Sequence, residues 1–198
     1  MRKALVPIAL LLVVAPLSAQ TSAQPTPEQL QAAYELHKGD FDYLLGDWEF
    51  KAVSKEYGPY GGYWSAVRLD GEQILDEFRV VGDSGETYYL TTTIRAYNAV
   101  RDQWELIGMD ASKGLHDFGT ARRVAAEMHI EQRFGVMSDS PSLWRIRYFD
   151  IQPERFSWSA DRSLDDGKTW EKEYLTIEAH RIGPAHPLGP LAKARKSS

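Results

Sequence analysis

The chain contains no cysteine among its 198 residues. It can therefore form no disulfide and carry no lipid on an N-terminal cysteine, and it lacks the commonest ligand of structural zinc sites. The longest apolar stretch, Ala4 to Leu17, is shorter than the roughly 20 residues of a bilayer-spanning helix. No Gly-x-Ser-x-Gly, phosphate loop or dinucleotide fingerprint is present. The sequence thus predicts a fold held by its core alone, with no catalytic residues and no metal site identified.

Positive charge is also scarce, with 23 Lys and Arg against 28 Asp and Glu and a formal net charge of -5. Loss of Arg2 and Lys3 with a cleaved leader would make the charge -7. An acidic surface disfavours nucleic acid and anionic membranes as partners. We expect a small molecule as the partner, no insertion into a membrane, and a monomer or homodimer.

The N-terminus has the layout of an export signal. Arg2 and Lys3 precede the apolar stretch, and small residues end at Ala19. We therefore expect residues 1–19 to be a cleaved signal peptide and the protein to be secreted or periplasmic. Residues 20–39 are predicted to hold a disordered start and one helix, residues 40–182 a barrel, and residues 183–198 a disordered tail.

The predicted helix begins at Thr26, an N-cap followed by a proline and by Gln29, the glutamine of a capping box. Gly39 is expected to end it. One apolar stripe follows the helical period and should pack on the barrel; it comprises Leu30, Ala33, Tyr34 and His37.

From Trp48 onward the apolar period changes to two, and turn residues separate short segments. This pattern predicts an all-β fold, an antiparallel up-and-down barrel of about eight to ten strands. The expected strands are 47–57, 62–69, 72–81, 86–97, 103–111, 115–120, 122–134, 142–150, 154–162 and 169–181. The apolar face of the expected strand 122–134 should hold Val124, Ala126, Met128, Ile130 and Phe134. Charged residues on its other face argue for a barrel that lies in water and not in an outer membrane.

Two motifs stand at opposite ends of this domain. Ser163-x-Asp165-x-Gly167-x-Thr169-Trp170 matches the Asp-box hairpin, in which the aspartate ties down turn amides and the tryptophan packs beneath. At the start, Gly46-x-Trp48 opens the first strand. Alternation on the last strand places Arg181 inward with Ile177 and Ala179, so its guanidinium is expected to stack on Trp48.

These motifs resemble those of lipocalins and related calycins, which begin with Gly-x-Trp and cover that indole with an arginine or lysine of the closing strand. The sequence is more closely similar to a bacterial lipocalin-like family of unknown function, in residues 41–48 and 163–170. The resemblance spans roughly residues 40–182 and implies a small calycin barrel with a central cavity and no established reaction.

Aromatic residues are the candidates for a cavity wall, although most are expected to be core. Neighbouring Asp76 and Glu77 should face opposite sides of a strand, and the inward one is expected to pair with an arginine such as Arg95 or Arg147. The predicted ligand-lining residues are Trp64, Tyr88, Arg95, Trp144, Tyr148 and Trp158.

Four functional hypotheses remain open on the sequence. The first is a binding protein that holds an apolar or amphipathic molecule in the barrel without a cofactor. The second is an enzyme that uses one cavity carboxylate or arginine for acid–base chemistry. The third is a haem barrel similar to nitrobindins, which ligate iron through a histidine near the C-terminus; His180 occupies a similar place, but alternation puts it on the outer face. The fourth is a packed barrel with no ligand.

Overall fold

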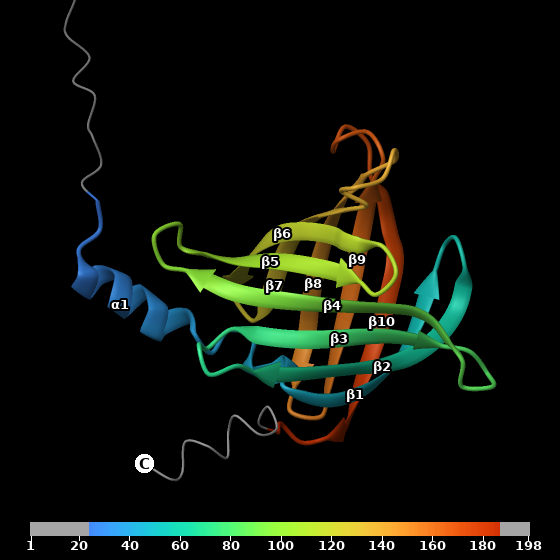
Figure 1. Ribbon diagram of the computed structural model, residues 1–198, viewed down its shortest axis with the longest axis horizontal. Coiled ribbons are helices and arrows are strands. Elements are labelled where there is room, and N and C mark those ends of the chain that lie inside the picture. The colour runs from blue at the N-terminus through green and yellow to red at the C-terminus, as the bar shows by residue number, and fades with distance from the viewer. Residues whose placement is uncertain (1–23, 187–198) are drawn as a thin grey trace, which may run out of the picture.

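A computed structural model describes residues 24–186, which form one helix, a short 3-10 turn and a barrel (Figure 1). The predicted signal peptide lies outside the described residues, as does most of the predicted tail. The elements are α1 (Pro27–His37), η1 (Asp42–Leu44), β1 (Gly46–Ser54), β2 (Gly58–Arg68), β3 (Ile74–Val81), β4 (Thr87–Asn98), β5 (Gln103–Asp110), β6 (Gly114–Val124), β7 (Glu127–Phe134), β8 (Ser142–Gln152), β9 (Arg155–Ser163) and β10 (Glu171–Gly183).

Every strand pairs antiparallel with its neighbour in sequence, and β1 also pairs with β10, so the sheet closes on itself. Trp48 of β1 stands opposite Trp64 of β2 and opposite Arg181 of β10. Closure leaves no unpaired strand edge. The predicted all-β, antiparallel up-and-down barrel is confirmed, with ten strands.

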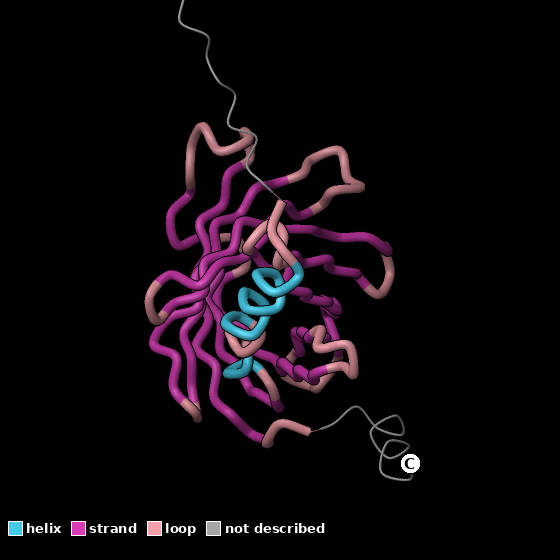
Figure 2. The backbone as a smooth tube through the Cα atoms, turned by 90° about the vertical axis from the view of Figure 1, so that its left-hand side faces the viewer, coloured by secondary structure: helices cyan, strands magenta, loops and turns pink. Residues whose placement is uncertain are grey.

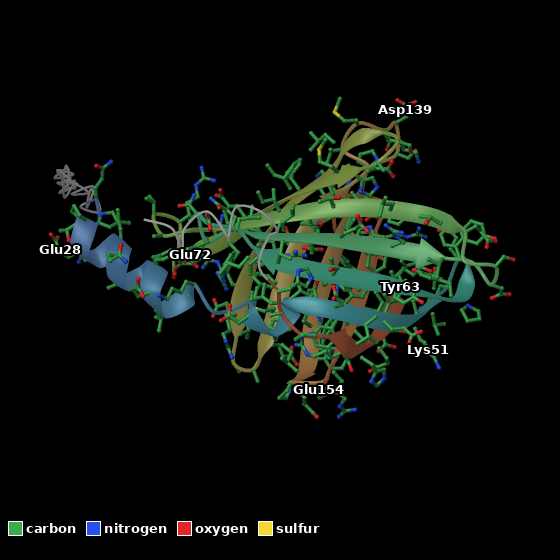
Figure 3. All side chains as sticks on the ribbon, turned by 60° about the horizontal axis from the view of Figure 1, so that its bottom comes forward. Glu28, Lys51, Tyr63, Glu72, Asp139 and Glu154 are labelled. Carbon is green, nitrogen blue, oxygen red and sulfur yellow. The ribbon has the colours of Figure 1, made fainter. Side chains whose placement is uncertain are left out.

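Side chains alternate between the lumen and the outer surface along each strand, as the period of two requires. On β1, Trp48, Phe50 and Ala52 are buried, whereas Lys51 is exposed. Lys51 and Tyr63 of β2 both project outward from the barrel (Figure 3). Away from β-bulges, the interior is therefore built from one residue in two along each strand.

One predicted strand is wrong. Residues 122–134 do not form a single strand, because β6 ends at Val124 and a two-residue turn leads into β7 at Glu127. Ala125 has φ 55°, and Val124 is exposed. Inward residues have odd numbers in β6, such as Ala121, and even numbers in β7, such as Met128. The turn exchanges inward and outward positions between odd and even residue numbers. The apolar face predicted for residues 122–134 therefore combined residues of β6, the turn and β7.

Helix α1 starts as predicted, with both hydrogen bonds of the capping box between Thr26 and Gln29. Its stripe does not pack as expected, since no residue of the helix is buried. The helix projects from one end of the barrel and lies in front of that end in Figure 2. Its last turn contacts the barrel, where the His37 ring stacks on Tyr97 of β4 with the ring centres 5.1 Å apart. No helix within residues 24–186 is long and apolar enough to cross a membrane.

We call the end of the barrel beside α1 the floor and the opposite end the mouth. Phe41 and Leu44 enter the floor from the segment before β1 and are fully buried with Trp48. This segment occupies the space between the barrel and α1, which accounts for the outward position of the helix. β10 ends at Gly183, one residue beyond the predicted end of the barrel.

Candidate functional site

The floor is sealed by the predicted pair of Trp48 and Arg181. The Arg181 guanidinium carbon lies 4.1 Å from the centre of the Trp48 ring, and Arg181 also donates to the carbonyls of Leu45 and Pro153, each at 2.7 Å. The indole Nε1 of Trp48 donates to the Leu44 carbonyl at 2.8 Å. The predicted cation–π stack is thus present.

The backbone conformation and the close neighbours of position 46 require glycine there. Its φ is 112°, and a β-carbon there would lie 2.5 Å from Nη1 of Arg181 and 2.7 Å from the carbonyl oxygen of Gly183. A larger residue would therefore be strained in its backbone and would displace the arginine.

A buried ion pair occupies the middle of the lumen. Asp76 and Arg95 are both almost fully buried and contact one another directly. The second carboxylate oxygen of Asp76 accepts a hydrogen bond from Nε1 of Trp64 at 2.7 Å. Glu77 faces outward and pairs with Arg79, and Arg147 is also on the outer surface. The expectation of an internal ion pair is confirmed for Asp76 with Arg95.

Of the six predicted lining residues, Arg95 belongs to this pair, and Trp64, Tyr148 and Trp158 are buried in the core cluster. The Tyr148 ring lies 5.7 Å from that of Trp64 and 6.5 Å from that of Trp158, and burial raises the pKa of its hydroxyl. Trp144 lies nearer the mouth, opposite Gln132. Tyr88 is apart from all of them, 70% exposed, with its hydroxyl donating to Glu86. These contacts leave the lower half of the lumen filled with side chains.

A second polar cluster, which we call the mouth cluster, consists of Tyr89, His116, Asp117 and Gln132. The register between β5 and β6 shifts at Gly108 and Met109, so two successive residues of β6, His116 and Asp117, lie on the inner side. Nδ1 of His116 lies 2.8 Å from Oδ2 of Asp117, and the Gln132 amide donates to Oδ1. The Tyr89 hydroxyl is 3.4 Å from Nε2 of His116.

Two glycines make room for this cluster. A β-carbon on Gly108 would overlap the Asp117 carboxylate, and one on Gly119 would lie 2.9 Å from Cα of Gln132. Asp117 and Gln132 are buried nonetheless. The absence of side chains at Gly108 of β5 and Gly119 of β6 therefore leaves space for the Asp117 carboxylate and for Gln132.

Charge and burial at the mouth favour a neutral tyrosine. Burial, followed by the negative charges of Asp117 and Asp110, raises the pKa of Tyr89. The hydroxyl and amide of Ser112 lower the pKa of Asp110. When a neutral His116 donates from Nδ1 to the Asp117 carboxylate, Nε2 is left as an acceptor, the arrangement used by general bases.

Several inward-facing side chains in the upper half of the lumen are less buried than those of the lower half. Thr93 faces inward, since it pairs with the buried residues Asp76 and Gly108, yet it keeps intermediate exposure. The same intermediate exposure is found at other inward-facing residues of this half: Phe78, Tyr89, Phe134 and Trp144. The mouth cluster and these aromatic rings thus lie together at the mouth, above the ion pair, and we call this part of the lumen the cup.

The Asp-box hairpin has the predicted geometry. The Asp165 carboxylate accepts from the backbone N–H and the hydroxyl of Thr169 at 2.9 and 2.7 Å, and the hydroxyl of Ser163 accepts from the N–H of Gly167. These donors lower the pKa of Asp165 to about 2. Trp170 packs against Gly167, with Arg145 stacked on its other side at 4.0 Å. The motif joins β9 to β10 at the mouth and has no contact with the mouth cluster among the bonds described.

His180 does not suit a haem in the lumen. It is exposed on β10 between the inward residues Ala179 and Arg181, and it pairs with Glu49 and Arg155 on the outer surface. Of the histidines in residues 24–186, His116 is the one placed in the lumen. We therefore derive no step through haem at His180.

Hollows also occur outside the lumen. A groove of about 430 Å³ crosses the outer surface of β6 to β9, between charged side chains that include Arg122, His129 and Arg147. A smaller one of about 120 Å³ lies at the floor beside Asp40 and Tyr43. Most charges of the larger groove are already paired, for example His129 with Glu127 at 2.7 Å.

Comparisons with known proteins bear on the fold. No protein-family model and no curated protein sequence matches the chain. Among solved structures it is similar to the crystal structure of Rv2717c from M. tuberculosis, with 14% identity and a TM-score of 0.52. The match covers 75% of this chain and 96% of that one. The shared feature is the barrel. At this identity the likeness concerns architecture alone, and the family resemblance of the sequence stays a prediction.

The mouth cluster was not predicted from sequence. A β-bulge reverses the alternation between Leu115 and Asp117, so no count of odd and even positions reveals it. The available signal was the pair Gly108 and Gly119, each in the middle of a strand where glycine weakens the sheet unless something approaches closely.

Proposed function

We propose that the protein binds a small amphipathic molecule in the upper half of the barrel. The observation that supports this is the mouth cluster, in which a buried carboxylate and amide lie beside His116 and beside inward-facing aromatic rings that keep intermediate exposure. Small-molecule sites commonly combine an apolar wall with a few convergent polar groups. Export to the periplasm or medium is part of the proposal and rests on residues 1–19 alone.

The chemistry of the cup specifies the kind of ligand. Asp117 and Nε2 of His116 accept hydrogen bonds, so the polar end of the ligand should donate, as a hydroxyl or an amine does. Phe78, Phe134 and Trp144 offer an apolar wall to the remainder. Burial of about 200 Å² of apolar ligand surface would contribute about 5 kcal/mol at 25 cal/mol per Å².

The depth of the site is set by the central ion pair. Asp76 and Arg95 form an ion pair beneath the cup, and the rings of Trp64 and Tyr148 pack near them. A ligand therefore rests on this layer instead of reaching the floor, which limits it to about one ring system. Large lipids are disfavoured for the same reason.

The test uses 2-naphthol, a fluorescent aromatic alcohol with one hydroxyl donor. We expect it to bind the wild-type protein in a fluorescence titration. Thr93→Phe places a ring in the cup and should weaken binding at least tenfold. Thr92→Phe, one residue away on the outer surface of the same strand, is the matched control and should leave binding unchanged. Circular dichroism should show both variants folded.

Asp117→Asn tests the polar contact, because it retains the shape of the side chain but removes its charge. Loss of a hydrogen bond to a charged group should weaken binding about 10- to 100-fold. Equal binding by the wild type, Thr93→Phe and Asp117→Asn would contradict the proposal.

A specific observation also favours the enzyme hypothesis, namely the fixed imidazole of His116 facing the cup. A bound molecule extracted from the protein purified from its native host would identify the substrate to test. Turnover that disappears in His116→Gln while binding persists would assign catalysis to this site.

A further inference from the structure

The outer surface of β4, β5 and β6 carries an apolar patch formed by Ile94, Ile107, Met109, Leu115 and Phe118, each between 38% and 51% exposed. The residues are direct cross-strand neighbours: Ile94 faces Ile107, Ile107 faces Phe118, and Met109 faces Leu115. These three strands run side by side across the barrel wall turned toward the viewer in Figure 1. We call this group the outer patch.

Strand β5 shows how unusual the patch is. Its inward residues Trp104 and Leu106 are buried, and its outward residues Ile107 and Met109 are apolar as well. A strand with apolar residues on both faces is typical of sheets that are covered on both sides. Helix α1 lies at the floor, and no other described element covers the outer face of β5.

We propose that the outer patch is the contact surface of a homodimer, with the same patch of a second copy seated on it. Taking about 200 Å² for a fully exposed large side chain, the five residues expose roughly 450 Å² of apolar surface. A stable interface needs about 800 Å² per partner. The remaining area of about 350 Å² would come from the polar rim of the patch, of which Thr92 and Thr120 are part.

The charges around the patch favour a second copy over a charged partner. On one side Glu77 pairs with Arg79 at 2.8 Å, and on the other Arg133 pairs with Asp166 at 2.7 Å. The rim thus carries both signs, balanced locally. A neutral apolar face offers no specific attraction to a basic or acidic partner, whereas it complements itself under twofold symmetry.

The patch and the mouth cluster share strands. The register shift at Gly108 and Met109 turns Leu115 outward to the patch and His116 and Asp117 inward to the lumen. Association through the patch would pack a second copy against the outer face of the bulged strands β5 and β6. The dimer is nevertheless independent of ligand binding, because it uses the opposite face of the sheet.

Sedimentation velocity on the mature full chain over a range of about 1 to 100 µM tests the inference. We expect a dimer for the wild type. Ile107→Glu introduces a charge at the centre of the patch and should raise the dissociation constant at least about a hundredfold. Val53→Glu is the matched control, since Val53 is an outward residue of β1 with 58% exposure outside the patch, and it should remain dimeric.

Phe118→Lys provides a second variant, and unchanged thermal unfolding of the separated subunits would show that the barrel itself is intact. A wild type that is monomeric over the whole range overturns the proposal. A dimer that withstands both Ile107→Glu and Phe118→Lys overturns it as well. A chain that dimerises only after removal of residues 187–198 would show that this segment covers the patch instead, which also contradicts the proposal.

Discussion

The ion pair in the lumen gives the sharpest prediction about stability. Arg95→Met keeps much of the length of the side chain but removes the partner of Asp76, leaving a carboxylate that is 2% exposed without an opposite charge. Breaking a buried pair by removing one partner typically costs about 3–5 kcal/mol. The free energy of unfolding of a domain is roughly 5–15 kcal/mol, so a loss of this size should be readily measurable.

The pH dependence of the loss identifies its cause. In Arg95→Met the unpaired carboxyl should have a pKa above its unfolded value, because burial disfavours the charged form. The folded variant then binds the proton more tightly than the unfolded chain does. Its stability should be greatest below about pH 4 and should fall as the pH rises toward the new pKa of Asp76.

Urea unfolding followed by tryptophan fluorescence measures this at pH 4.5 and pH 7. The double variant Asp76→Asn, Arg95→Met removes both charges and should recover about 2 kcal/mol relative to Arg95→Met alone. An Arg95→Met loss below about 1 kcal/mol at pH 7, or an equal loss at both pH values, would refute the reasoning.

Two further predictions concern the structural motifs. Gly46→Ala should lower the free energy of unfolding by more than about 1 kcal/mol, because φ is 112° and the new methyl group meets Arg181; a thermal midpoint equal to the wild type would contradict this. Asp165 has its pKa lowered to about 2 by its hydrogen-bond donors, so the stability it contributes is present above about pH 4 and is lost as the pH falls toward 2. Asp165→Asn should therefore flatten the acid side of the stability profile measured by circular dichroism, and an unchanged acid slope would count against the assigned hydrogen bonds.

The sequence by itself determined the architecture. Alternating polar and apolar residues separated by turn residues specify antiparallel strands, because each strand must hide one face and the turns are local. The same local logic identified the cap at Thr26, the Asp-box hairpin and the inward direction of Arg181. It also predicted that one of the neighbouring acids Asp76 and Glu77 faces inward and meets an arginine such as Arg95 or Arg147, and the structure selects Asp76 with Arg95.

The tertiary structure alone decided the site and the outer patch. A bulge at His116, opposite Gly108 and Met109, shifts the alternation on β6, and it is defined only by the pairing of β5 with β6. The two-residue turn after Val124 shifts it again before β7. Which outward apolar residues become neighbours likewise depends on register: Ile107 and Phe118 are adjacent only because β5 and β6 pair as they do. Periodicity tells which face a residue occupies, whereas pairing across strands determines what it meets there.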